Sequence, residues 1–79
     1  MNPENQVKLT EIFRTIFDDT ELVVTDEMTA ADIPRWDSLN HINLIMQVEA
    51  EFDIQFASTE VAKLDNVKDL KMIIGEKLQ

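Results

Sequence analysis

Apolar side chains recur at three- and four-residue spacing in three segments of this chain, and this helical period most restricts what it can fold into. The first segment predicts a helix over residues 3 to 17, with Asn2 as its N-cap and Pro3 at its first position. Its apolar stripe consists of Leu9, Ile12, Phe13, Ile16 and Phe17. One face of this helix therefore has to pack against other elements.

The most regular helical period lies between Leu39 and Phe52. Its apolar residues fall largely on one face of a helix: Leu39, Ile42, Ile45, Met46, Val48 and Phe52. Polar residues fall mainly on the other face: Asn40, Asn43, Gln47 and Glu51. The pattern predicts a second amphipathic helix.

Two more helices are predicted in the last third of the chain. Ser58 is placed to cap a short third helix that reaches about Leu64. Asn66, with Asp69 three residues later, resembles a capping box for a fourth helix. The apolar stripe of the fourth helix consists of Val67, Leu70, Ile73, Ile74 and Leu78.

Two stretches between these helices lack a helical period. Residues 18 to 37 form a long connection in which Thr29 and Asp32 give only a one-turn capping pattern, and loops longer than about 12 to 15 residues are uncommon unless they are functional. The run "FDIQF" alternates like a strand but would have no partner strand, so we interpret it as an extended connector whose Ile54 and Phe56 fill the bundle. The prediction is an all-α four-helix bundle, with three longer helices, a short third helix and a long loop between helices one and two.

Length and composition limit the function. A chain of 79 residues forms a single domain, taken as residues 1–79, and buries only roughly 60% of its unfolded surface, enough for a core but not for a deep catalytic cavity. Cysteine is absent, no apolar run has the length of a membrane span, and the N-terminal residues lack the order of a secretory signal. We expect a soluble, cytoplasmic monomer without membrane insertion.

The net charge of −9 is unevenly distributed. Residues 15 to 34 contain six acidic side chains and no Lys or Arg, and residues 36 to 62 contain five more, again without a basic residue. The negative potential of these acidic side chains repels nucleic acid and anionic lipid and favours binding to basic protein surfaces. The simpler interpretation is that the acids keep a small domain soluble. Nucleic acid is not expected as a partner under either interpretation.

The sequence gives little support for a catalytic site or a metal site. A serine hydrolase needs a base oriented on its nucleophile and an oxyanion hole, usually built by a glycine-rich turn. His41 follows Ser38 by three residues, but it is the single histidine, and the single glycine, Gly75, lies far away in the sequence. We therefore expect no catalytic residues and interpret His41 as a solvated residue on the helix surface. Without cysteine or a second histidine, and without the ligand spacing of a calcium loop, no dedicated metal site is expected either.

Asp37 and Ser38 stand at the start of the second predicted helix. Either side chain can accept a hydrogen bond from an unpaired backbone N–H there, and most Asp-Ser pairs do no more than that. A serine at a helix N-terminus is also exposed, and the backbone donors and the helix dipole favour a phosphate at that position. From these residues alone, capping and modification of Ser38 both remain open.

The run from Asp37 to Val67, "DSLNHINLIMQVEAEFDIQFASTEVAKLDNV", resembles the second half of an acyl carrier protein. The matching features are Asp-Ser-Leu at the helix start, an apolar helix ending in Glu-x-Glu-Phe, a connector, a short third helix and a fourth helix. The N-terminal helix and the acidic loop fit as well, so the resemblance covers nearly the whole chain.

The resemblance implies that a phosphopantetheinyl transferase, using coenzyme A and Mg²⁺, joins 4′-phosphopantetheine to Ser38 through a phosphodiester. The base and the metal would belong to the transferase, and the thiol of the arm would carry an acyl group as a thioester. Asp37, Leu39, Met46 and Glu49 are implied to lie on the surface that partner enzymes bind. For Leu39 and Met46, simple core packing is an equal alternative.

The chain also departs from the family pattern. Carriers of fatty-acid synthesis usually have a glycine shortly before Asp-Ser-Leu and acids just after it, where this chain has Arg35, Trp36, Asn40 and Asn43. The run "WDSLNH" is more similar to stand-alone carriers of specialised pathways, such as those of polyketides, lipopeptides or surface polysaccharides. The implied partners are an acyl-loading ligase or acyltransferase and downstream biosynthetic enzymes, in fatty-acid-like or specialised biosynthesis.

Two functions of different classes follow. In the first, the protein is a non-catalytic shuttle whose cargo lies between the helices, where Ile45, Val48 and Ile73 are candidate lining residues. In the second, it is an unmodified acidic helical adaptor or regulator that binds a basic protein partner, with Ser38 serving only as a cap.

Overall fold

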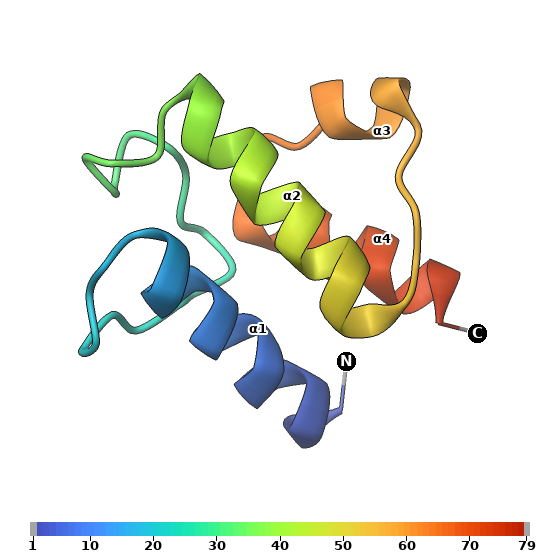
Figure 1. Ribbon diagram of the computed structural model, residues 1–79, viewed down its shortest axis with the longest axis horizontal. Coiled ribbons are helices and arrows are strands. Elements are labelled where there is room, and N and C mark those ends of the chain that lie inside the picture. Colours follow the sequence, from blue (N-terminus) through green and yellow to red (C-terminus); the bar gives the residue numbers. More distant parts are fainter. Residues whose placement is uncertain (1, 79) are drawn as a thin grey trace.

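The computed structural model describes residues 2–78, which form four helices and no strand. The helices are α1 (Pro3–Ile16), α2 (Ser38–Phe52), α3 (Ser58–Ala62) and α4 (Val67–Lys77). Figure 1 shows α2 crossing the middle of the molecule, with α1 on one side and the short α3 on the other. The predicted all-α bundle with a long loop between its first two helices is confirmed. None of the helices within residues 2–78 is long and apolar enough to cross a membrane.

The start of α1 follows from its first residues. Asn2 is the N-cap and its Oδ1 accepts a hydrogen bond from Asn5 N–H at 2.8 Å, while Pro3 occupies a position where no N–H is needed. The buried side chains of this segment are Leu9, Ile12, Phe13 and Phe17. The helix ends at Ile16, one residue short of the predicted end.

The apolar side of α2 is divided between the core and solvent. Its buried residues are Leu44, Ile45, Val48 and Phe52. Leu39, Ile42 and Met46, which belong to the same apolar pattern, are instead 69%, 53% and 61% exposed. The apolar residues of α2 span a wider part of its circumference than the part that other elements bury. The sequence pattern does not show where this burial ends.

Beyond α2, the chain continues in an extended connector, as predicted. Asp53 ends the helix in the left-handed conformation, with φ of 55°, which turns the chain toward α3. Ile54 is buried and Phe56 is half-buried against the core. The connector therefore contributes side chains to the bundle without pairing as a strand.

The two C-terminal helices differ from the prediction in detail. Ser58 is the first residue of α3 and not its cap, because the helix begins one residue earlier than the pattern suggested and Ala57 occupies the N-cap position. The Glu60 carboxylate accepts from Ala57 N–H at 2.8 Å and from Lys77 Nζ at 2.9 Å, and these partners lower the pKa of Glu60 below its usual value. Lys77 thereby ties the short α3 to the end of α4.

The predicted cap of α4 is present. Asn66 Oδ1 accepts from Asp69 N–H at 2.9 Å, and the Asp69 carboxylate reaches back to Asp65 N–H at 3.2 Å. Of the predicted stripe, Val67, Leu70 and Ile74 are buried. Ile73 is only half-buried, and Leu78, the C-cap residue, is 42% exposed, so the predicted stripe is wider than the buried face of α4.

The long loop between α1 and α2 is part of the folded structure. Val24 and Ile33 are buried in the core. The carbonyl oxygens of Met28 and Asp26 accept from the N–H groups of Val67 and Lys68, at 3.0 and 2.9 Å, and so satisfy donors at the start of α4. In the one-turn pattern predicted for this loop, Asp32 Oδ2 accepts from Thr29 N–H at 2.9 Å.

The division of the apolar side of α2 predicts unequal effects of one substitution at two positions. Leu44→Ala removes a fully buried side chain and is expected to lower the free energy of unfolding by about 2 to 5 kcal/mol. Leu39→Ala, at an exposed position of the same helix, is expected to change it by less than about 0.5 kcal/mol. Urea unfolding of both variants tests this, and similar losses would contradict the assigned burial.

The ion pair between the loop and α4 predicts a pH dependence. Lys71 Nζ lies 2.6 Å from Asp26 Oδ1, and this hydrogen bond and the lysine charge lower the pKa of Asp26. A lowered carboxyl pKa adds stability above the unfolded-state value that is lost as the pH falls through the folded-state value. Lys71→Met should raise the Asp26 pKa toward its usual value.

Wild type should accordingly be more stable than Lys71→Met at neutral pH, with the difference vanishing in acid. An NMR titration of the Asp26 carboxyl carbon and unfolding curves at both pH values measure the two effects. An unchanged Asp26 pKa in the variant would refute the pairing.

Candidate functional site

At the start of α2, Asp37 and Ser38, the two candidate capping residues, have different roles. Asp37 is the N-cap: its Oδ1 accepts from Asn40 N–H at 2.8 Å, and its carbonyl oxygen accepts from His41 N–H at 2.8 Å. Ser38 is the first residue of the helix and is exposed. None of the hydrogen bonds among residues 2–78 involves the Ser38 hydroxyl, so capping by Asp37 leaves that hydroxyl accessible.

Asn40 ties the helix start to the loop before it. Its Nδ2 donates to the Arg35 carbonyl oxygen at 2.7 Å, and its Oδ1 lies 3.4 Å from Asn43 Nδ2. An acidic side chain could not donate in this way, because a carboxylate is an acceptor only. The two asparagines that depart from the family pattern therefore have a local structural role, which the sequence pattern did not indicate.

Trp36 anchors this region to the core. Its ring packs edge-on against Phe13 and at a tilt against Phe17, with centroid distances of 5.6 Å in each case. Its Nε1–H donates to His41 Nδ1 at 3.0 Å, and the two rings stack with an interplanar angle of 22°. The loop, α1 and the first turns of α2 thus meet at one aromatic side chain.

The interpretation of His41 as a solvated surface residue was wrong. The imidazole is half-buried, and its Nδ1 accepts a hydrogen bond from Trp36 Nε1–H. With Asp37 as the N-cap, Trp36 and His41 occupy the two positions of a hydrophobic staple, in which the residue before the cap packs on the fourth helical residue. That spacing was visible in the sequence and is the signal that could have revealed the contact.

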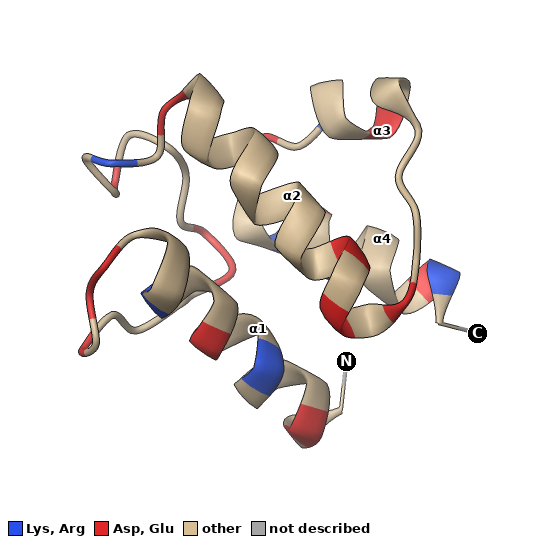
Figure 2. Cartoon of the chain, in the orientation of Figure 1, with Lys and Arg blue, Asp and Glu red and all other residues tan. Residues whose placement is uncertain are grey.

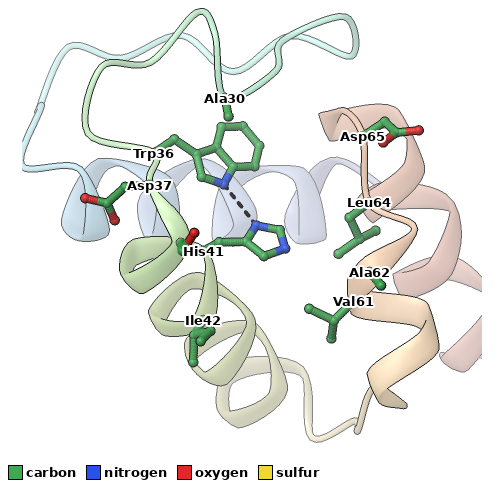
Figure 3. Close-up of a pocket in the computed structure, with 10 residues that line it drawn as sticks. Ala30, Trp36, Asp37, His41, Ile42, Val61, Ala62, Leu64 and Asp65 are labelled. Carbon is green, nitrogen blue, oxygen red and sulfur yellow. Dashed lines mark hydrogen bonds between the residues drawn. The ribbon is translucent and has the colours of Figure 1, made fainter.

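A cleft of about 540 Å³ lies beside Ser38, between the start of α2 and the α3 segment. Ser38, His41 and Ile42 form one side, and Val61 and Leu64 belong to the other. Figure 3 shows the Trp36 ring at one end of the cleft and the imidazole of His41 extending from α2 toward α3. An apolar cleft thus begins at the free hydroxyl. Ile45, Val48 and Ile73, the candidate cargo-lining residues, are not among those that line it.

The remaining predicted site residues lie along α2. Leu39 and Met46 are exposed, which excludes the alternative of core packing for both. Asp37 is exposed but engaged as the cap, and Glu49 is half-buried, with its Oε2 accepting from Phe56 N–H at 2.8 Å. Glu49 therefore holds the connector to the end of α2.

The charge on α2 is confined to its C-terminal part. Figure 2 shows no acidic or basic residue on the helix before Glu49, although Asp37 immediately precedes it. The acidic residues concentrated in this part of the sequence are therefore absent from the first three turns of the helix that begins at Ser38. Its exposed surface there is apolar and amide in character.

Within residues 2–78, no group of three or more His, Asp or Glu side chains is arranged to hold a metal ion. The geometry of the site therefore consists of an accessible hydroxyl, a helix N-terminus and a neighbouring cleft. Such a site is suited to carrying a group on the Ser38 hydroxyl.

Comparison with known proteins assigns the chain to a class. It is similar to the solution structure of the holo acyl carrier protein from Geobacter metallireducens, with 48% sequence identity over 92% of this chain and 84% of that one, and a TM-score of 0.86. The chain belongs to the acyl carrier protein family. Members of this family are carriers and not enzymes, so the protein is an acyl carrier.

A more distant similarity supports the fold alone. A candidate acyl carrier protein from Mycobacterium tuberculosis has a TM-score of 0.81 at 22% identity, over 90% of this chain and 95% of that one. No protein-family model matches the sequence.

The assignment of the cap to Asp37 predicts different effects at adjacent residues. Asp37→Ala removes the acceptor for Asn40 N–H and should lower the free energy of unfolding by about 1 kcal/mol. Ser38→Ala removes a hydroxyl outside the cap and should change it by less than about 0.5 kcal/mol. Chemical unfolding measures both. A larger loss in Ser38→Ala would show that Ser38 is the capping residue.

Proposed function

We propose that Ser38 is the attachment point of a 4′-phosphopantetheine arm, transferred from coenzyme A by a phosphopantetheinyl transferase with Mg²⁺. The Ser38 oxygen forms the new phosphodiester as the pyrophosphate bond of coenzyme A breaks, and adenosine 3′,5′-bisphosphate leaves. The observation that carries the proposal is the exposed hydroxyl at the first position of α2, left free because Asp37 forms the cap. The similar Geobacter protein is a holo acyl carrier protein, which supports a prosthetic group here too. When attached, the arm supplies the thiol that this cysteine-free chain lacks.

The residues around Ser38 fit a phosphodiester. The N–H groups in the first turn of a helix have no partner within the helix, and together with the helix dipole they favour a negative charge at that end. The first turn of α2 contains no acidic residue, and the Asp37 carboxylate is engaged by Asn40 N–H. The negative charge of the new group would thus meet backbone donors at the helix end.

The surface read by partner enzymes is proposed to be the exposed side of α2. Leu39 and Met46 supply exposed apolar contacts, while Asp37 and Glu49 place negative charge at the two ends of this surface. Between them, α2 carries no carboxylate. Because exposed ion pairs are worth only roughly 0.2 to 1 kcal/mol each, partners of this carrier would depend more on apolar contact than on basic patches.

This surface supports assignment to a specialised pathway. We propose that the carrier, as a single domain, shuttles acyl thioesters between a loading ligase or acyltransferase and downstream enzymes of polyketide, lipopeptide, surface-polysaccharide or similar biosynthesis. Asn40 and Asn43 stand where carriers of fatty-acid synthesis have acids, which is the feature that favours this assignment. Essential service in bulk fatty-acid elongation would refute it.

The attachment proposal is tested by co-expression with a promiscuous phosphopantetheinyl transferase and intact-mass measurement. Wild type should gain one phosphopantetheine, and Ser38→Ala should gain none. Ser58→Ala is a matched control, because Ser58 is the other serine of the chain and is also the exposed first residue of a helix. This variant should be loaded like wild type.

The alternative function, an unmodified acidic adaptor, predicts a different result. In that case wild type would show no mass gain although the same transferase loads a control carrier. Loading of Ser38→Ala would equally contradict the proposal, since it would place the group on another residue.

A further inference from the structure

We propose that His41 Nε2–H, oriented by Trp36, is a hydrogen-bond donor to an oxygen atom of the arm on Ser38 or of its acyl group when these enter the cleft between α2 and α3. The proposal rests on the attachment of the arm to Ser38. Where the acceptor oxygen belongs to the acyl substituent, His41 also favours oxygen-bearing cargo over plain alkyl chains.

The hydrogen bond from Trp36 determines which nitrogen of His41 carries the proton. A neutral imidazole has one donor and one acceptor nitrogen. Because Trp36 Nε1–H can only donate and His41 Nδ1 receives it at 3.0 Å, Nδ1 is the acceptor and the proton of the neutral ring lies on Nε2. The packing of Trp36 against Phe13 and Phe17 holds the indole N–H in place. The orientation of the His41 imidazole is therefore fixed by its hydrogen bond to a ring that packs on the core.

The remaining nitrogen faces the cleft. In Figure 3, Nε2 lies on the side of the imidazole toward α3, away from Trp36. No hydrogen bond within the described part of the chain uses this nitrogen. The nearby lining is largely apolar and includes Ile42, Val61 and Leu64, while the Asp65 carboxylate points away from the imidazole. His41 therefore offers an unused donor inside an apolar-walled cleft, where a hydrogen bond is strengthened by low local polarity.

The arm is the occupant that the geometry favours. Ser38 and His41 are three residues apart on one helix and therefore neighbours on its surface, and both line the cleft. Because a group attached to Ser38 is tethered beside the cleft, its effective concentration there is high. It is therefore favoured in the cleft over a free ligand of the same chemistry. The shared chemistry is an oxygen acceptor, which comes from an amide carbonyl of the arm, the thioester carbonyl or an oxygen substituent of the acyl group.

The selectivity follows from the cost of covering a donor. An alkyl chain lying against Nε2–H removes water without replacing its hydrogen bond, whereas a carbonyl or hydroxyl oxygen restores that bond. Leu44, Val48 and Ile74 are fully buried in the core, and none of them lines the cleft. An acyl group that brings an oxygen to Nε2–H is therefore favoured in the cleft over one that covers this donor with alkyl carbon.

NMR of ¹⁵N-labelled protein tests the proposal through exchange of the His41 Nε2 proton with water, above the titration range of histidine. Four forms are compared after mass spectrometry has verified loading: unmodified, phosphopantetheinylated, hexanoyl and 3-hydroxyhexanoyl. Exchange should be about tenfold slower in at least one loaded form than in the unmodified protein, the factor that corresponds to about 1.4 kcal/mol. The first form to show the effect identifies the oxygen as that of the arm, the thioester or the acyl substituent.

Equal exchange in all four forms overturns the proposal and leaves attachment at Ser38 intact, because loading is verified separately. Trp36→Phe is the second variant: it keeps an aromatic ring against Phe13 and Phe17 and removes the N–H donor. In this variant the ¹⁵N shifts of His41 should show a mixture of tautomers and the slower exchange should be lost. Full retention of the slow exchange would overturn the orienting role of Trp36.

Discussion

The hydrogen bond from Asn40 N–H to the Asp37 carboxylate is the contact on which the site depends. It starts α2 at Ser38, so the serine occupies the first helical position and its hydroxyl is not used by the cap. Asp37 satisfies one backbone donor of the first turn, the N–H of Asn40. The other backbone donors of that turn stay available for a negatively charged group on Ser38. The same one-residue placement puts Trp36 before the cap and His41 after it, where their side chains meet.

Trp36 connects this local arrangement to the rest of the bundle. Its ring lies on Phe13 and Phe17 of the first helical segment, and its N–H holds the imidazole of His41 at the wall of the cleft. The start of α2, the loop and α1 are therefore one packed unit. The exposed apolar side of the same helix is free of such contacts, which leaves it available to partner proteins.

Much of this fold could be predicted because helical periods and caps are local: Asn2 and Asn66 act as the sequence indicated. The sequence left open whether Leu39 and Met46 of α2 are buried, since the apolar pattern of a helix does not show which part of it neighbouring elements cover. Ser58 was assigned as a cap one residue too late, because boundaries depend on backbone geometry that several residue types tolerate. His41 was misplaced because the local spacing of Trp36 and His41 around the N-cap was not interpreted as a hydrophobic staple. What the sequence does not show is that Trp36 packs on Phe13 and Phe17, a contact between distant parts of the chain.

We propose that Ser38 carries the arm in the protein's own cells, where no transferase has been added. Peptide mapping by mass spectrometry of protein isolated from those cells is the decisive measurement. We expect phosphopantetheine on the tryptic peptide that begins at Trp36 and ends at Lys63, with fragment ions that place it on Ser38 and not on Ser58. An unmodified peptide, in an extract whose other carrier proteins are modified, would refute attachment at Ser38.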